Sequence, residues 1–520
     1  MKHLPLNLSD FEQLITGNYI YVDKTQYIYN LVQGTKFHFL SRPRRFGKSL
    51  LVSTLDKLFK GKKKLFNDLW ISKSDYDWTI YPVIMIDFSA VGSNTSSDLK
   101  ISLVNRLMEI AEEYDLEISK NPIVEDMTRS LINALIKKYD KVVLLVDEYD
   151  HPLLKHIDNE EVARSVLEVL KGFYHVIKSN SGKFKNIFVT GITKFSKASL
   201  FSGLNNLQDI SLDNRYGTIL GYTSEEINSY FSDFIKHIAE KRNQSYGELI
   251  DLMRSWYNGY QFGGKSVKVY NPFSILYFLD KEELENYWFA TGTPSFLLTL
   301  IKKYQYPIQD LSGSLLNILD LGTFDIGKLP LVPIFFQAGY LTIKDYNPAT
   351  QNYTLEYPNH EVESAFLSYF LNETTAIPIA SVKNYVFSLQ QALVNDDIDS
   401  FINVLHQFLC TIPYDIHIPL EKYYQSIFYV IFQLIGSYVN VEIKTNIGRI
   451  DTTIETKNCI YIFELKIDST GSKALHQIED KKYYERFLGL NKIIKLIGLS
   501  FDTKLKNISS NYKVKIISSR

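Results

Sequence analysis

Residues 37–51, FHFLSRPRRFGKSLL, decide the fold of the first half of this 520-residue chain. The run begins as a buried strand, passes through a tight loop and is expected to enter a helix at about Lys48. The loop ends in Gly47, Lys48 and Ser49. In a phosphate-binding loop, backbone N–H groups cradle the phosphates, the lysine reaches the β and γ oxygens, and the hydroxyl binds Mg²⁺.

Arg42 stands where the general phosphate-loop motif has its first glycine. Its Cβ and its charge replace a residue that would let the backbone approach a phosphate closely. Two interpretations stay open: Arg42 impairs nucleotide hydrolysis, or its guanidinium contacts a phosphate directly. Gly-Lys-Ser is also a common tripeptide without function, and its strand–loop–helix setting and the second motif that follows it weigh against that alternative.

A second nucleotide motif lies at residues 142–150, VVLLVDEYD. Asp147, at the tip of a buried strand, would hold the water shell of Mg²⁺, and Glu148 would polarise the attacking water. The alternative is a buried strand that ends in an acidic turn. Thr190 lies near the tip of another apolar run, where it could sense a γ-phosphate or cap a helix. Because strands alternate with helices, we expect a parallel sheet whose C-terminal edge carries these tips.

The last hundred residues contain a second pattern with chemical meaning. Residues 448–455 and 459–467 are expected to form neighbouring strands joined by a turn. Side chains alternate along a strand, so Glu464 and Lys466 share a face, and the hairpin can bring Asp451 beside them. The two carboxylates are suitable ligands for a divalent cation, and Lys466 can orient or activate the attacking water.

An ordinary ion pair on a solvated face is the alternative for Glu464 and Lys466. The strand argues against it, because Ile460 and Ile462 occupy the same face as the charged pair and the other face is apolar as well. A strand that is apolar on both faces is buried, and a buried charged pair favours a functional site.

Several motifs in order, at residues 42–49, 146–150, 190–196 and 200–207, resemble the bacterial AAA-ATPase-like family over roughly residues 4–215. RPRRFGKS is the usual loop of that family. The resemblance implies an ATP-binding P-loop domain in which Ser49 and Asp147 hold Mg²⁺ and Glu148 is catalytic. The residues that it places at the nucleotide are Arg42, Arg45, Gly47, Lys48, Ser49, Asp147 and Thr190.

Residues 413–520 resemble the PD-(D/E)XK nuclease superfamily, whose domains are habitually fused to this AAA-ATPase-like domain. Asp451, Glu464 and Lys466 match its D…E-x-K pattern. Glu421 matches an auxiliary acidic position before the first strand, and Gln477 matches a further polar position of the active site. The resemblance implies that all five are catalytic and that Asp451 and Glu464 bind Mg²⁺ or Mn²⁺.

We therefore predict an α/β protein with four parts. Residues 1–220 form the AAA-ATPase-like P-loop domain with a parallel sheet, and residues 221–325 form a helical lid. Residues 326–412 form a winged-helix-like unit and a helical linker, and residues 413–520 form the PD-(D/E)XK α/β domain. The winged-helix-like unit allows no conclusion about function, since such units bind DNA and also serve only in packing.

Composition limits the partners and the compartment. The net charge of −1 gives no global basic field, so a nucleic-acid surface would have to be a local patch. Cys410 and Cys459 build neither a disulfide framework nor a zinc site, which fits a reducing cytoplasm. The N-terminus lacks the apolar core of a signal peptide, and the longest apolar stretch is too short to span a membrane. We expect a cytoplasmic protein without a membrane partner.

The combined hypothesis is an ATP-binding, metal-dependent nuclease in which the P-loop module controls phosphodiester hydrolysis. Its cofactors would be ATP and Mg²⁺ or Mn²⁺, its substrate nucleic acid, with DNA favoured over RNA, and it could form homo-oligomers. One alternative is a nucleotide-switched regulatory or nucleic-acid-binding protein with an inactive nuclease fold. Another is a nuclease whose nucleotide domain does not hydrolyse ATP.

Overall fold

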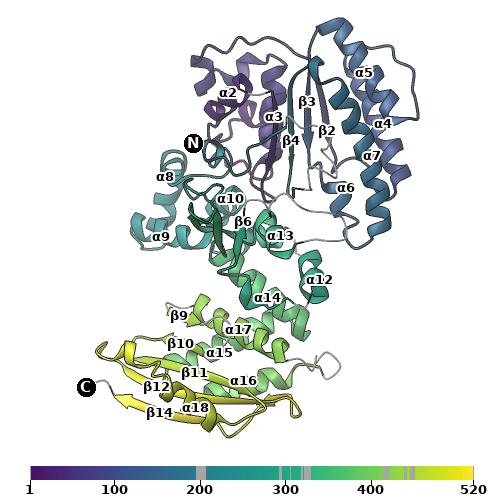
Figure 1. The fold of residues 1–520 in the computed structure, drawn as a ribbon. Coiled ribbons are helices and arrows are strands. Elements are labelled where there is room, and N and C mark those ends of the chain that lie inside the picture. Colours follow the sequence, from purple (N-terminus) through teal and green to yellow (C-terminus); the bar gives the residue numbers. More distant parts are fainter. Residues whose placement is uncertain are drawn as a thin grey trace. The chain divides into compact units, whose positions relative to one another are not determined.

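The computed structural model describes residues 2–34, 36–194, 207–291, 295–304, 306–317, 320, 330–413, 421–438, 442–445 and 451–518, called the described residues below. The chain divides into two compact units (Figure 1). The nucleotide unit comprises residues 1–296 and 313–361, and the nuclease-type unit comprises residues 297–312 and 362–520. The four-part division expected from the sequence stays a prediction.

A parallel five-stranded sheet is the centre of the nucleotide unit. Its strands stand in the order β2-β3-β4-β1-β5, with every neighbouring pair parallel. Their bounds are β1 Phe37–Ser41, β2 Val83–Asp87, β3 Val142–Asp147, β4 Phe184–Gly191 and β5 Gln208–Asp209. β1 and β3 are buried throughout, as their continuous apolar runs require. The parallel α/β sheet predicted from the sequence is confirmed, and the ends of β1, β3 and β4 are neighbours at its C-terminal edge.

Helices cover both faces of this sheet (Figure 1). One layer contains α4 (Ser96–Glu113), α5 (Val124–Tyr139) and α7 (Glu160–Ser179), which pack against one another. The opposite layer contains α3 (Lys48–Phe59), which follows the phosphate loop, and α1 (Phe11–Thr16). α3 is buried on most of its length, so the loop before it is held between sheet and helix. α2 (Thr25–Gln33) and α6 (His151–Leu154) complete this part.

A helical region follows the sheet and forms its own apolar core around Ile227, Phe231 and Met253. Its helices are α8 (Ser224–Lys241), α9 (Tyr246–Tyr257), α10 (Pro272–Lys281) and α11 (Tyr287–Ala290). Capping boxes at the starts of α8 and α9 define where those helices begin. This region is called the lid below, and its helical character agrees with the sequence-based expectation.

A small antiparallel sheet and α13 (Leu331–Ala338) complete the nucleotide unit. The sheet has the order β6-β8-β7, with β6 Leu315–Asn317, β7 Thr342–Asn347 and β8 Asn352–Glu356. β7 and β8 form an antiparallel hairpin within the region for which the sequence predicted a winged-helix-like unit. The pairing of β6 with β8 was not predicted, because a three-residue strand carries little periodicity.

The nuclease-type unit is a mixed sheet between helices. β9 (Glu442–Thr445), β10 (Asp451–Glu455) and β11 (Cys459–Ile467) are antiparallel, and β11 pairs parallel with β12 (Ile493–Asp502). β13 (Asn507–Ile508) and β14 (Lys513–Ser518) both pair antiparallel with β12. The helices of this unit are α12 (Ser295–Tyr304), most of which lies in it, α14 (His360–Thr375), α15 (Ile379–Val394), α16 (Ile398–Cys410), α17 (Glu421–Tyr438) and α18 (Gly471–Asp480).

The two faces of β11 pack against different helices. Phe463 contacts Phe401 of α16 and Phe432 of α17 on one face. Ile460 and Ile462 pack with Ile478 of α18 on the other. The strand is therefore buried on both sides, as its alternation predicted, and Glu464 and Lys466 lie on the face that α18 covers.

Candidate active sites

The phosphate loop has the backbone of an anion site. Gly47 has φ 94° and Arg45 has φ 64°, so the chain turns sharply before α3. No side chain caps α3, which leaves the N–H groups of its first turn available to an anion. Lys48 is buried, and its Nζ donates to the carbonyl oxygens of Arg42 and Pro43, at 3.0 Å each. Burial lowers the pKa of Lys48.

Ser49 and Asp147 meet beneath this loop. The Ser49 hydroxyl hydrogen-bonds to the Asp147 carboxylate, which also accepts from the N–H of Glu148 at 2.9 Å. Burial raises the pKa of Asp147 to about 6, against the opposing effects of Ser49 and Lys48. A hydroxyl and a carboxylate at the end of neighbouring elements are ligands that suit Mg²⁺ beside a phosphate.

A cavity of about 550 Å³ opens from the loop. Gly47, Lys48, Ser49 and Glu148 line its polar part. Its remaining wall comes from the N-terminal segment, including Tyr21, from residues 219–222 just before the lid, and from Phe273 and Leu276 of the lid. Its volume lies in the range of sites for small organic ligands, and it combines an anion-binding end with an apolar wall, so it fits a nucleotide.

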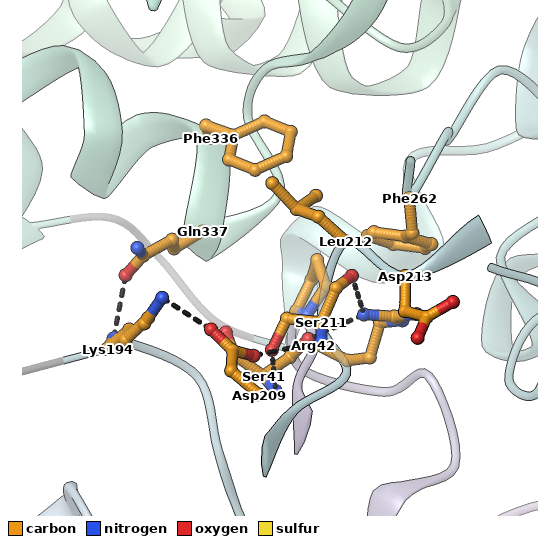
Figure 2. Close-up of a pocket in the computed structure, with 11 residues that line it drawn as sticks. Ser41, Arg42, Lys194, Asp209, Ser211, Leu212, Asp213, Phe262, Phe336 and Gln337 are labelled. Atoms are coloured by element: carbon orange, nitrogen blue, oxygen red, sulfur yellow. Dashed lines mark hydrogen bonds and ion pairs between the residues drawn. The ribbon is translucent and has the colours of Figure 1, made fainter. Parts of the chain in front are cut away.

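Arg42 lies in the wall of a second cavity, separate from the one just described (Figure 2). Its guanidinium donates to the carbonyl oxygens of Ser41 at 2.8 Å, Ser211 at 2.7 Å and Tyr216 at 3.0 Å. It lies 4.0 Å from the ring centroid of Phe262, and only 1% of the residue is exposed. Burial lowers its pKa to about 9. Arg42 lines a separate cavity of about 300 Å³ and holds backbone carbonyls together there.

Of the other residues predicted to bind the nucleotide, two line the larger cavity and one lies inside the sheet. Arg45 lines the larger cavity, and its guanidinium lies 4.9 Å from the Phe273 ring centroid. Glu148 also lines it, with φ 47° and a carboxylate oxygen 3.6 Å from His151 Nδ1. Thr190 is fully buried, and its hydroxyl donates to the carbonyl oxygen of Leu40 at 2.7 Å. Its side chain therefore joins β4 to β1 inside the sheet.

Asp150 is a structural residue at this edge to which the motif gave no role. It is buried and accepts from the N–H groups of Ile192 and Thr193 and from the Thr193 hydroxyl, at 3.1, 2.6 and 2.6 Å. The end of β4 is thereby tied to the end of β3. The acidic run 147–150 was the available signal, but its members could be told apart only by their contacts.

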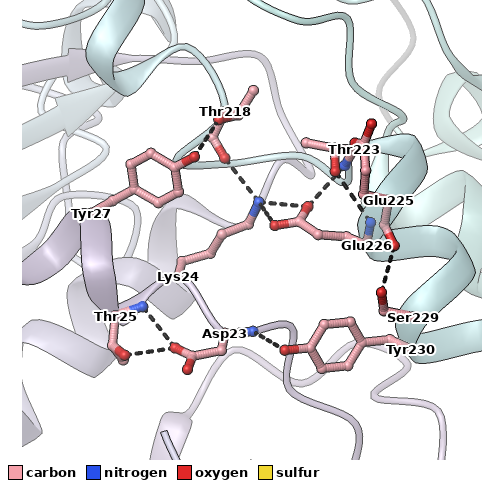
Figure 3. A network of polar contacts seen from close by, with 10 residues as sticks. All are labelled: Asp23, Lys24, Thr25, Tyr27, Thr218, Thr223, Glu225, Glu226, Ser229 and Tyr230. Carbon is pink, nitrogen blue, oxygen red and sulfur yellow. Dashed lines mark hydrogen bonds and ion pairs between the residues drawn. The ribbon is translucent and has the colours of Figure 1, made fainter. Parts of the chain in front are cut away.

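Lys24 forms a buried junction at the cavity wall (Figure 3). Its Nζ donates to both carboxylate oxygens of Glu226, at 2.6 and 2.7 Å, and to the carbonyl oxygen of Thr218 at 2.8 Å. Burial lowers the pKa of Lys24, and Glu226 opposes that effect. The pair ties the N-terminal segment to lid helix α8. No local pattern could predict it, since its members are 202 residues apart.

In the nuclease-type unit, the register brings the predicted centre together. Asp451 of β10 is the direct partner of Glu464 of β11, so the two positions are cross-strand neighbours. Lys466 Nζ lies 2.8 Å from Glu464 Oε1 and donates to Gln477 Oε1 on α18. Glu464 is 1% exposed. The side chains of Asp451 and Glu421 lie outside the described residues, although Glu421 begins α17 as expected.

Two glycines let α18 approach the sheet closely enough for this contact. A Cβ on Gly498 would lie 2.2 Å from the carbonyl oxygen of Gly471, and a Cβ on Gly471 would lie 2.7 Å from that of Gly498. Gly498 is also the β12 register partner of Glu464. The close packing of α18 on β12 thus carries Gln477 to Lys466.

The buried polar atoms around Lys466 fit a divalent cation. Among the described residues, Glu464 Oε2 and Gln477 Nε2 are buried without a hydrogen-bond partner. Such an oxygen costs free energy unless a donor or a cation satisfies it. No three His, Cys, Asp or Glu side chains cluster within the part of the chain that the structure describes, so Glu464 needs the carboxylate of position 451 to build a hard-oxygen site.

The two folds and their sites are those of a P-loop-type N-terminal domain and a nuclease-type C-terminal unit. A family model described as "Predicted AAA-ATPase" matches residues 5–201, and one described as "PD-(D/E)XK nuclease superfamily" matches residues 420–511. Both resemblances seen in the sequence are thereby confirmed.

A relative from Azotobacter chroococcum mcd 1, named "Uncharacterized protein in vnfD 5'region", is 34% identical over 523 residues and covers 98% of each chain. The chain therefore belongs to the family of AAA-ATPase-like proteins that carry a C-terminal PD-(D/E)XK nuclease superfamily domain. No solved structure matches it.

Proposed function

We propose that this protein is a metal-dependent nuclease whose cleavage of phosphodiester bonds is controlled by its ATP-binding P-loop module. The observation that carries the proposal is the buried Glu464 with the half-buried Lys466 and Gln477 beside it, and with Asp451 as the register partner of Glu464. Removing a carboxylate such as that of Glu464 from water without a function usually costs stability. Glu464 Oε2 has no hydrogen-bond partner among the described residues, and binding a metal ion would satisfy this oxygen.

Each residue has a distinct role in this proposal. Asp451 and Glu464 hold the cation, which when bound supplies Lewis-acid chemistry at the scissile phosphate. Lys466 places its positive charge next to Glu464, where it orients the attacking water and offsets the charge that develops on the phosphate. Gln477 positions Lys466 through the hydrogen bond to its Nζ. Glu421 contributes an auxiliary acidic group.

The contacts of Lys48 support control by ATP rather than a role in packing alone. In this structure the lysine binds carbonyl oxygens of its own loop, and the phosphates of ATP would take over those hydrogen bonds. Ser49 and Asp147 would hold Mg²⁺, and Glu148 would polarise water. Arg45 adds positive charge at the larger cavity. Arg42 instead holds the start of the loop in place by donating to the carbonyl oxygen of Ser211.

DNA is the substrate that we propose first, with RNA as the comparison, and the assembly could be a homo-oligomer. Among the helices that the structure describes, none is both long and apolar enough to cross a bilayer. Both cysteines are free, which fits the cytoplasm as the compartment that we propose.

The test is a cleavage assay with the full chain on single-stranded DNA, double-stranded DNA and RNA, with Mg²⁺ or Mn²⁺ and with or without ATP. We expect Lys466→Ala to lower the cleavage rate by at least about a thousandfold, since it removes a charge at the reacting phosphate. Lys473→Ala, which removes an exposed lysine of α18, is the matched control and should cleave like the wild type. Lys48→Ala should abolish the effect of ATP.

Two results would overturn the proposal. Cleavage by Lys466→Ala at the wild-type rate would show that the site is wrongly assigned. Wild-type protein that cuts no nucleic acid under any of these conditions, yet changes its oligomeric state with ATP, would favour a nucleotide-switched binding protein with an inactive nuclease fold.

A further inference from the structure

The loop that precedes Gly47 is embedded in the lid. Phe46 is 1% exposed and packs edge-on against Tyr260 of the lid, with ring centroids 4.8 Å apart. Arg45 lies over Phe273 at the start of α10. A Cβ on Gly339 would lie 2.6 Å from Pro43 Cβ, so that glycine permits close packing on the loop. The conformation of the loop is thus coupled to what surrounds it.

Trp288 of α11 contacts the loop through a directed hydrogen bond. Its indole Nε1 donates to the carbonyl oxygen of Arg44 at 3.0 Å, and the residue is 4% exposed. Its ring also lies against Tyr340, with centroids 5.1 Å apart. A buried indole N–H has few alternative partners, so a change in the direction of the Arg44 carbonyl has to be followed by Trp288.

Glu361 accepts hydrogen bonds from Trp288 and from Ser274. The backbone N–H of Trp288 donates to Glu361 Oε1 at 2.6 Å, and the Ser274 hydroxyl of α10 donates to Oε2 at 2.7 Å. Glu361 is fully buried in the first turn of α14. It is also the last residue of the nucleotide unit, since the chain continues into the nuclease-type unit at Val362.

The structure shows one arrangement of hydrogen bonds in the loop, and a bound phosphate would supply a second. Here Lys48 holds the carbonyls of Arg42 and Pro43, immediately before Arg44. When Lys48 turns to a phosphate, both carbonyls lose their donor, and the backbone of the loop relaxes. An element with two discrete arrangements is what physical coupling between sites requires.

We propose that Trp288 and Glu361 relay the nucleotide state of the phosphate loop to the first turn of α14, where the chain enters the nuclease-type unit. This inference rests on the proposed function, because it names the route by which ATP would control the nuclease. Trp288 acts here as a positioning residue that reads the Arg44 carbonyl, and Glu361 transmits its movement.

The experiment measures amide hydrogen exchange at the start of α14 in the full chain, with and without ATP and Mg²⁺, while calorimetry measures ATP binding. Trp288→Phe keeps an aromatic ring and removes only the indole donor. Glu361→Leu keeps a side chain of similar volume and removes both acceptor oxygens. Trp70→Phe is the matched control, since Trp70 is 39% exposed and lies in a different segment (Trp70–Lys73).

We expect ATP to change the exchange rates of these amides at least about threefold in the wild type and in Trp70→Phe. Trp288→Phe and Glu361→Leu should still bind ATP within about tenfold of the wild-type Kd, and the exchange response should vanish in both. The ATP-induced change in tryptophan fluorescence should also be lost in Trp288→Phe and kept in Trp70→Phe.

The outcomes separate this inference from the proposed function. If the wild type binds ATP and the exchange at α14 does not respond, or if Trp288→Phe responds like the wild type, the relay is overturned and the nuclease proposal stands. If calorimetry detects no ATP binding, the nucleotide part of the proposed function fails, and the relay fails with it. Loss of cleavage alone bears only on the nuclease site.

Discussion

The packing of α18 on β12 can be tested by adding a single methyl group. Gly498→Ala would put a Cβ 2.2 Å from the carbonyl oxygen of Gly471 and 2.6 Å from the backbone nitrogen of Leu475, whereas ordinary contacts begin at 3.4 Å. Both neighbours are backbone atoms at the start of α18, so no side chain can rotate out of the way. The helix has to recede from the strand by about 1 Å.

The magnitude follows from this displacement. Overpacking of a tightly packed core costs about 1–3 kcal/mol, so the free energy of unfolding of the nuclease-type unit should fall by that amount. The hydrogen bond between Lys466 Nζ and Gln477 depends on the position of α18 and should lengthen or break. A displacement of about 1 Å at a catalytic group lowers rates by about a hundredfold, which is the loss of cleavage that we expect.

Urea unfolding followed by circular dichroism gives the stability, and the cleavage assay gives the activity. Gly182→Ala is the control, because a Cβ there meets no atom within 4 Å and the loss of glycine is otherwise the same. An unfolding free energy of Gly498→Ala within about 0.5 kcal/mol of the wild type would refute the packing argument. Full cleavage activity in a destabilised variant would instead refute the positioning role of Gln477.

Three further variants test contacts in the nucleotide unit. Arg42→Lys keeps the charge but cannot reach three carbonyls, so urea unfolding should show a loss of about 2–3 kcal/mol with little change in ATP affinity. The opposite result, weaker ATP binding at unchanged stability, would place Arg42 at a phosphate. Asp150→Ala removes the acceptor of two N–H groups, so the free energy of unfolding should fall by roughly 3 kcal/mol and the thermal midpoint should fall with it. An unchanged midpoint would contradict the role of Asp150 in joining the ends of β3 and β4. Burial raises the pKa of Glu361 from 4.5 to about 8, and at 1.36 kcal/mol per pKa unit this difference is at most roughly 5 kcal/mol. Between these two pH values the folded state keeps a proton that the unfolded chain has lost, so the stability contributed by Glu361 is fully present below about pH 4.5 and is lost as the pH rises through about 8. Urea unfolding at pH 6 and about pH 9 should show this fall in the wild type and a smaller one in Glu361→Gln, whereas equal slopes would contradict it.

Local patterns in the sequence were sufficient for the parts of the sites that lie within one element or across one turn. The phosphate loop could be identified from Gly47, Lys48 and Ser49, because the turn and the helix start are built from adjacent residues. Glu464 and Lys466 could be assigned to one face because strand side chains alternate, and their register with Asp451 follows from one hairpin.

The roles of other residues depend on partners that are distant in the sequence. Arg42 donates to carbonyls about 170 residues further along the chain, and no local pattern predicted these contacts. The hydroxyl of Thr190 is used by Leu40 within the sheet, although its place at a strand tip suggested other roles.

By itself, then, the sequence determined the class of the fold and predicted two sites with the residues at their centres, because hydrophobic periodicity and motif spacing are local properties. Only the tertiary structure decided which polar groups are turned toward the sites and which hold the fold together. The contacts between Trp288 and Arg44, and between Trp288 and Glu361, illustrate this. A buried donor takes whichever acceptor packing brings to it, and packing is a property of the whole chain.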